Sequence, residues 1–131
     1  FKKLMLQAGD IELDSKIKLS FDGIKDANGK TCLYEIYCGM DKLNPGHRRK
    51  IANDILKMVF YEKFKEMEFN KKLIVVDEKI KDLLNSQNHS TWLNLAIKEF
   101  AIEVEYVKID EELENELIKA RKDQSKPHNK E

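Results

Sequence analysis

Cysteine, proline and glycine are scarce in this sequence of 131 residues, which has two Cys, two Pro and five Gly. Their scarcity excludes a disulfide-stapled scaffold, a collagen-like chain and a low-complexity chain, since each of these classes is rich in one of them. Cys32 and Cys38 fall in one predicted strand, roughly 20 Å apart at the usual rise per residue, which is too far for a disulfide. We therefore expect free thiols and a reducing, cytoplasmic setting.

Long apolar runs and an excess of one charge are also missing. No run approaches the roughly 18 apolar residues that a membrane helix needs, and no signal peptide is recognisable, so we expect no membrane partner. Lys plus Arg and Asp plus Glu each number 24, which makes the net charge zero. This balance excludes a chain coated with basic charge, but it leaves room for a local basic patch that could contact nucleic acid.

The residues that are present have a globular composition, with 41% hydrophobic and 37% charged residues. A chain of this length buries one core and has no room for a second full domain. We predict a single domain over residues 1–124 and a polar C-terminal tail over 125–131.

Alternation with a period of two indicates strands in the first third of the sequence. The expected strands cover residues 10–13, 16–22 and 31–40. The Asn28-Gly29 pair between the last two is a strong hairpin signal. Before them, residues 1–8 fit the last turns of a helix, with Gly9 as its C-terminal stop.

Asn44-Pro45 predicts the start of a helix, with Asn as the N-cap and Pro in the first turn, and the helical pattern runs to Met67. The later elements are a buried strand at 73–76, a helix broken near 86–89, a strand at 102–109 and a helix at 110–124. Helical spacing predicts a core position for Trp92, Leu95, Ala96 and Phe100. The predicted fold class is α/β, with a mixed central sheet in which an antiparallel meander is followed by parallel strands, flanked by helices.

Two acidic residues stand where the hairpin would bring them together, Asp22 at the end of one strand and Glu35 inside its partner. The residues around Glu35 are Leu33, Tyr34, Ile36 and Tyr37. A carboxylate among such neighbours is costly unless a cation or hydrogen bonds compensate it. Because Mg²⁺ binds carboxylate oxygens and water, the acidic pair is a candidate metal site.

Several short motifs follow one another in a definite order. They are Ser20-Phe21-Asp22-Gly23, Tyr34-Glu35-Ile36-Tyr37, His47-Arg48-Arg49-Lys50 and Asp54-Ile55-Leu56-Lys57. In this order, with a hairpin between the first two and a buried parallel strand after the last, the sequence resembles the PD-(D/E)xK nuclease superfamily. The resemblance covers nearly the whole chain. Within the superfamily, the sequence looks more narrowly like an uncharacterised bacterial branch. It implies a restriction-endonuclease-like core.

The resemblance also implies metal-assisted hydrolysis of DNA phosphodiester bonds. Asp22, Glu35 and the backbone carbonyl of Ile36 would hold Mg²⁺ or Mn²⁺, which lowers the pKa of bound water. A homodimer is a further expectation, because cutting both strands of a duplex needs two sites.

The lysine of the family motif is displaced, since its position holds Tyr37. In some members the lysine lies on the following helix, and the resemblance makes Lys50 the expected substitute, ahead of Lys42. The residues expected to contact the DNA backbone are Lys42, Arg48, Arg49 and Lys57. The acidic residue that the family carries on its first helix is expected before Phe1.

Less specific interpretations stay open for the same residues. Asp22 also suits a turn at a strand end, and Glu35 a solvated cross-strand pair with Lys16 or Lys18. Tyr37 favours an alternative function, a catalytically inactive nuclease-like module that binds DNA or a protein partner. An unrelated α/β domain is the third interpretation.

Overall fold

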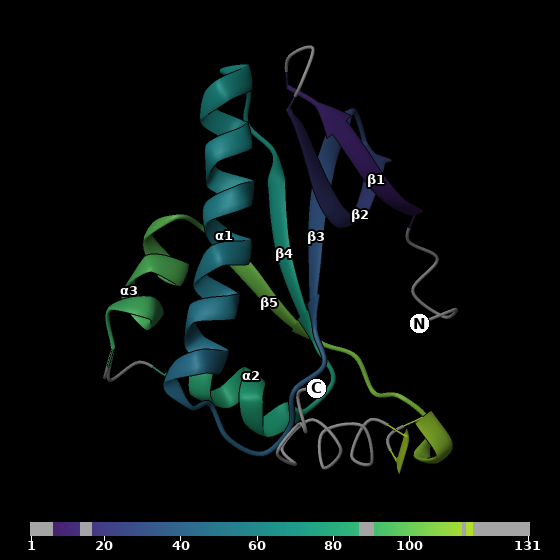
Figure 1. Cartoon of the computed structure of the whole chain (residues 1–131), viewed down its shortest axis with the longest axis vertical. Coiled ribbons are helices and arrows are strands. Elements are labelled where there is room, and N and C mark those ends of the chain that lie inside the picture. Colours follow the sequence, from purple (N-terminus) through teal and green to yellow (C-terminus); the bar gives the residue numbers. More distant parts are fainter. Residues whose placement is uncertain (1–6, 14–16, 87–90, 114, 117–131) are drawn as a thin grey trace, which may run out of the picture.

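The computed structural model of the chain describes residues 7–13, 17–86, 91–113 and 115–116. Within them five strands form one sheet in the order β1-β2-β3-β4-β5 (Figure 1). The strands are β1 (Gln7–Glu12), β2 (Lys18–Ala27), β3 (Lys30–Tyr37), β4 (Asn70–Val75) and β5 (Ile102–Tyr106). β1, β2 and β3 are antiparallel, and β3, β4 and β5 are parallel. The predicted mixed α/β sheet is therefore confirmed.

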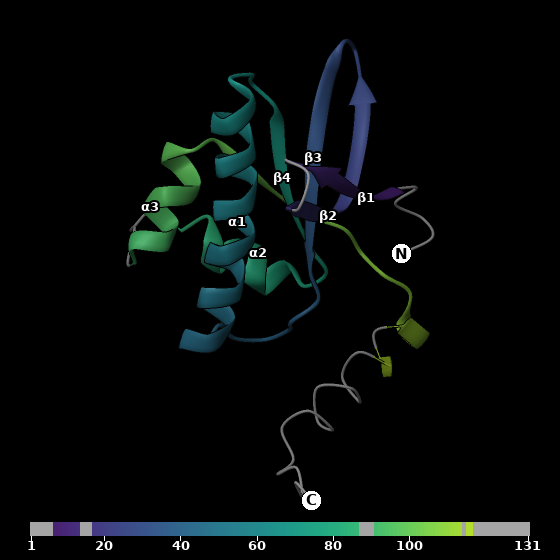
Figure 2. The ribbon, with the colours of Figure 1, turned by 45° about the horizontal axis from the view of Figure 1, so that its top comes forward.

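The helices α1 (Pro45–Lys65), α2 (Glu78–Leu84) and α3 (Trp92–Glu99) lie on the same side of this sheet (Figure 2). Right-handed crossovers explain the shared side, because β3, β4 and β5 are added in one direction across the sheet. α1 begins as predicted, with the Asn44 side chain accepting a hydrogen bond of 2.8 Å from the His47 N–H. No described helix is both long enough and apolar enough to cross a bilayer.

The buried core lies between α1 and the sheet. Its fully buried members include Leu33 and Leu73 from the sheet and Ile51 and Met58 from α1. Cys32 and Cys38 are free thiols, as expected. Sequential hairpins and crossovers thus leave α1 beside β3, where Lys57 reaches Glu35.

The prediction of a helix over residues 1–8 is wrong for residues 7 and 8, which the structure describes, because Gln7–Glu12 is strand β1. Gln7 pairs with Ile24 of β2, and sheet pairing overrides the local helical pattern. A Cβ on Gly9 would lie 2.5 Å from Ile24 Cδ1, so Gly9 allows close packing inside a strand and does not end a helix.

The elements near the C-terminus differ in length from their prediction. β5 ends at Tyr106 instead of residue 109. Residues 111–113 and 115–116 are helical, as expected, while the rest of the predicted helix and the tail 125–131 lie outside the described residues. Three of the four core positions predicted here are also wrong, because Trp92, Leu95 and Phe100 are 72%, 52% and 46% exposed. Leu93 and Ile97 of α3 face the core instead.

An ion pair holds the turn between α1 and β4. Lys71, whose side chain is 7% exposed, donates to Glu62 Oε1 at 2.7 Å, and Phe69 N–H donates to Glu62 Oε2 at 2.9 Å. Burial alone raises the pKa of Glu62, but the Lys71 ammonium and the Phe69 N–H hold it below its usual value. The charged form of Glu62 therefore stabilises the fold.

We expect Glu62→Ala to lower the free energy of unfolding by about 2 to 3 kcal/mol, because it leaves the Lys71 ammonium buried without its carboxylate. The control is Glu68→Ala, whose side chain is 90% exposed and lies 3.9 Å from Lys30, and which should change stability by less than about 0.5 kcal/mol. Urea unfolding at neutral pH measures both. Equal losses of unfolding free energy would show that the buried ion pair stabilises the fold no more than the exposed one.

Candidate functional site

A β-bulge in β2 creates the site. Phe21 pairs with Gly9 and Ile24 pairs with Gln7, so Asp22 and Gly23 together face a single residue of β1. The bulge comes where the β2–β3 ladder ends, at the pair Gly23–Tyr34. Asp22 is thus inside β2 and not at its end, and the turn interpretation does not apply.

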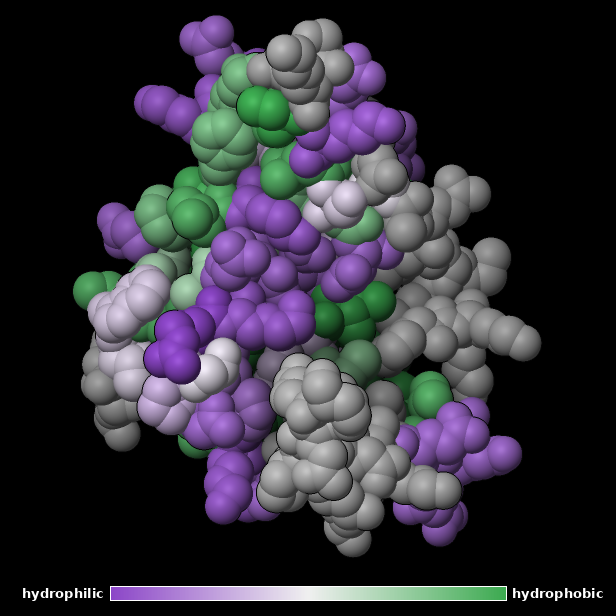
Figure 3. All heavy atoms as spheres, viewed as in Figure 1, coloured by the Kyte–Doolittle hydropathy of each residue, from purple (hydrophilic) through white to green (hydrophobic). Residues whose placement is uncertain are grey.

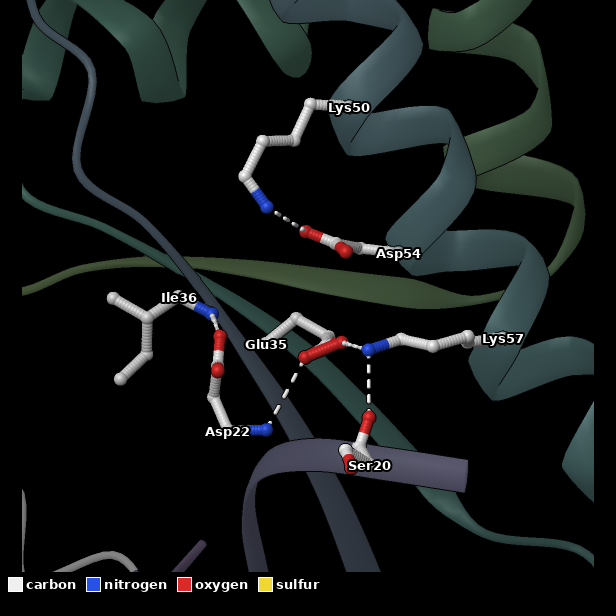
Figure 4. Close-up of polar contacts among 7 residues, drawn as sticks. All are labelled: Ser20, Asp22, Glu35, Ile36, Lys50, Asp54 and Lys57. Atoms are coloured by element: carbon white, nitrogen blue, oxygen red, sulfur yellow. Dashed lines mark hydrogen bonds and ion pairs between the residues drawn. The ribbon is translucent and has the colours of Figure 1, made fainter. Parts of the chain in front are cut away.

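Asp22 and Glu35 are brought together, as the sequence predicted. The Asp22 N–H donates to Glu35 Oε1 at 3.2 Å, and the Ile36 N–H donates to Asp22 Oδ2 at 2.8 Å (Figure 4). Each carboxylate therefore accepts a hydrogen bond from the backbone of the other strand. These two bonds continue the contact between β2 and β3 beyond the regular ladder.

Glu35 is 1% exposed and points from β3 toward α1, where Lys57 Nζ lies 2.6 Å from its Oε2 (Figure 4). The same ammonium donates to the Ser20 carbonyl at 2.7 Å and lies 5.5 Å from the centre of the Phe21 ring. Lys57 was expected on the DNA backbone, and its ammonium is instead held by Glu35 and β2. The alternative pair with Lys18 is not formed, and Lys16 lies outside the described residues.

Asp54 is a further acidic residue of the site that the sequence analysis did not single out. Its side chain is 6% exposed, and its Oδ2 lies 3.5 Å from Lys50 Nζ. Lys50, Asp54 and Lys57 are spaced at i, i+4 and i+7, so they share one face of α1 above Glu35 (Figure 4). The signal available in the sequence was the spacing of Asp54 from Lys50 and Lys57, which places the three residues on one face of the helix.

Burial, together with the nearby charges of Asp54 and Asp22, raises the pKa of Glu35 to about 7 despite the opposing effect of Lys57. Burial also raises the pKa of Asp54, which Lys50 and Lys57 partly offset. Crowding of acidic groups in a poorly hydrated site is a common feature of functional sites. The arrangement can therefore bind or release a proton near neutral pH.

The other predicted basic residues do not join this cluster. Arg48 Nη1 contacts Thr91 Oγ1 at 3.3 Å, on the side of α1 that faces α3. Arg49 lines a groove between α1 and α3, and Lys42 is exposed in the loop before α1. Tyr37 is buried, with its ring 6.1 Å from that of His47. The structure therefore spreads the predicted basic patch around the helix.

The site offers few side-chain ligands to a metal ion. No group of three or more His, Cys, Asp or Glu side chains within the described ranges is arranged to hold one. The candidate ligands are the Asp22 and Glu35 carboxylates, each of which accepts a hydrogen bond from a backbone N–H of the other strand. Two carboxylates suit Mg²⁺, which commonly keeps several water ligands.

Comparison with models of known families, with curated proteins and with solved structures found no match to this chain.

We expect the stability of the wild type relative to Glu35→Gln to fall as pH rises from about 4.5 to about 7. The unfolded chain releases the Glu35 proton near pH 4.5, while the folded protein keeps it up to about pH 7, so rising pH favours the unfolded chain between these values. The loss is about 1.4 kcal/mol per pH unit and about 3 kcal/mol in all.

Urea unfolding of both proteins at pH 5 and pH 8 measures this difference. Glu99→Gln, an exposed position on α3, is the matched control and should track the wild type at both pH values. A difference between wild type and Glu35→Gln that does not change with pH would contradict the raised pKa.

Proposed function

We propose that this protein is a metal-dependent nuclease that hydrolyses DNA phosphodiester bonds, with a core like that of the PD-(D/E)xK superfamily. The observation that carries the proposal is the pair of reciprocal hydrogen bonds that joins Asp22 to Glu35 across β2 and β3. The order of elements adds support, since a meander is followed by a helix and a parallel strand. That order is the one expected from the sequence resemblance.

Asp22, Glu35 and the Ile36 carbonyl would hold Mg²⁺ or Mn²⁺, which supplies a bound water of lowered pKa and neutralises charge on the phosphate. Asp22 is exposed, and its second oxygen makes no hydrogen bond within the described residues. The N–H and C=O groups of one strand residue point toward the same neighbouring strand. The Ile36 carbonyl is therefore expected beside Asp22, as its N–H is. The acidic pair therefore fits a small hard cation.

The two lysines of α1 suit different tasks. Lys57 is one quarter exposed and holds the Glu35 carboxylate in position through the 2.6 Å ion pair. Lys50 is 63% exposed, and its one ion-pair partner within the described residues is Asp54, at 3.5 Å. Its ammonium can therefore turn toward a phosphate oxygen at little cost, and we assign it the task of the lysine that Tyr37 replaces.

We expect the purified protein to nick supercoiled plasmid DNA with Mg²⁺ or Mn²⁺ and to stop when the metal is chelated. Glu35→Gln and Asp22→Asn should each lower the rate about a hundredfold or more, because each removes one metal-binding charge. Glu99→Gln removes an equal charge from the exposed end of α3 and should cleave like the wild type. A wild type inactive on duplex and single-stranded DNA with both metals would refute the nuclease.

We expect Lys50→Ala to lower the cleavage rate about tenfold or more with little change in stability, since its side chain is largely exposed. Lys57→Ala should lower both the rate and the free energy of unfolding, because it leaves Glu35 without its ion pair. Lys98→Ala, at an exposed position of α3, is the control. If Lys50→Ala cleaved DNA at the wild-type rate, the task assigned to Lys50 would belong to Lys57.

One observation favours the alternative, an inactive nuclease-like module that binds DNA or a protein partner. Glu35 is almost fully buried, and its Oε2 is held by an ammonium at the position where a metal ion would compete. An inactive module retains this pair as part of its core. Metal-independent DNA binding that Glu35→Gln leaves unchanged, without cleavage by the wild type, would support this function over the nuclease.

A further inference from the structure

Asp54 is a buried carboxylate whose charge the described residues compensate only weakly. Its side chain is 6% exposed, and its Oδ2 accepts no hydrogen bond within the described ranges. Lys50 Nζ lies 3.5 Å away on a side chain that is 63% exposed, and an ion pair with so exposed a partner contributes little. Lys57, the other nearby cation, binds Glu35 and the Ser20 carbonyl.

Two other carboxylates of the fold show what fuller compensation looks like. Glu35 and Glu62 each accept a hydrogen bond from a backbone N–H and lie within 2.7 Å of a lysine ammonium. Asp54 has neither a backbone donor nor so short an ion pair among the described residues. A charge buried in this way is costly, which points to a partner that these residues do not supply.

The Asp54 side chain is directed toward the acidic pair. Figure 4 shows it pointing from α1 toward β3, on the side of the helix from which Lys57 reaches Glu35. Besides burial, the charges of Asp54 and Asp22 both raise the pKa of Glu35, and the charge of Asp22 raises that of Asp54. The three carboxylates therefore border one space.

This space meets water on one side. Asp22 and Lys50 are exposed. Figure 3 shows hydrophilic side chains gathered over the middle of the molecule, where Figure 1 has α1 beside β3 and β4. The carboxylates thus lie at a polar part of the surface, where a hydrated ion can approach them.

The separation of the three carboxylates decides how Asp54 can act on such an ion. No three acidic, His or Cys side chains in the described part of the chain are close enough to hold one ion together, so Asp54 is not a direct ligand beside Asp22 and Glu35. Mg²⁺ commonly keeps several water ligands. Groups that accept hydrogen bonds from the ligands of a metal ion orient them and strengthen its binding.

We propose that Asp54 is a third acidic group of the metal site and acts on the ion through water, without binding it directly. Its burial without a short ion pair is then explained, because the positive charge that it lacks is the charge of the ion. Asp54 has this task only if Asp22 and Glu35 bind a metal ion, so its role rests on the proposed function.

Mn²⁺ binding to the purified chain without DNA, followed by the electron paramagnetic resonance signal of the free ion, tests this role. Asp54→Asn keeps the shape of the side chain and removes its charge, and it should weaken Mn²⁺ binding about tenfold. Asp22→Asn should weaken it by a larger factor, because it alters a direct ligand. Asp82→Asn, at an exposed position of α2, is the matched control and should bind like the wild type.

Urea unfolding of the metal-free protein at neutral pH separates this role from a structural one. Asp54→Asn should leave the unfolding midpoint unchanged or raise it, because it removes a buried charge that has no short ion pair. A structural ion pair with Lys50 would make the same substitution lower the midpoint. The Lys50→Ala background makes a second separation, since Asp54→Asn should weaken Mn²⁺ binding about tenfold there too.

Three results would each overturn the role of Asp54. They are wild-type Mn²⁺ affinity in Asp54→Asn, a loss of affinity that disappears in the Lys50→Ala background, and a lowered unfolding midpoint. A wild type that binds no Mn²⁺ overturns both this role and the metal-dependent nuclease. Binding of Mn²⁺ without cleavage of DNA refutes the nuclease alone, and a tenfold weaker Asp54→Asn then still supports the role of Asp54.

Discussion

The ion pair between Glu35 and Lys57 is the contact on which the arrangement of the site depends. Glu35 lies in β3, the middle strand of the sheet, and has almost no exposed surface. An uncompensated carboxylate there would cost several kcal/mol, so α1 must present a cation to it. Lys57 does so and also binds the Ser20 carbonyl, which ties the helix to β2 and β3 at once. One ammonium thereby fixes the rotation of α1 over the bulge that carries Asp22.

Local patterns predicted the elements that local physics determines. Period-two alternation, the Asn28-Gly29 turn and the Asn44 cap are decided within a few residues, and the structure has a strand, a turn and a helix start at those places. Strand order alone also brought Asp22 to Glu35. The rotation of α1 is a tertiary property, so the sequence could not show that Lys57, and not Lys50, would contact Glu35. The first strand was predicted at residues 10–13, but its beginning at Gln7 was missed because its pairing with β2 is equally non-local.

The helix α1 meets three different surroundings, which complicates its pattern of apolar and polar residues. One face packs Ile51 and Met58 into the core, a second carries Asp54 and Lys57 over the sheet, and a third exposes Leu56 and its apolar neighbours. Three unlike surroundings on one helix of 21 residues remove the simple division into an apolar and a polar side. Ile51 and Met58 are fully buried while Leu56 is 65% exposed, although all three are apolar, so hydrophobicity alone does not tell these faces apart.

The raised pKa of Glu35 connects the stability of the empty site to its proposed chemistry. Burial disfavours the charged carboxylate, and Lys57 compensates it only in part, since the pKa is still about 7. A divalent cation beside Asp22 and Glu35 would favour the same ionised state, so its binding must release the Glu35 proton and strengthen as pH rises. The charge that burial makes costly for folding is therefore the charge that a metal ion would stabilise most. A site of this kind gives up some stability at neutral pH in return for affinity toward the cation.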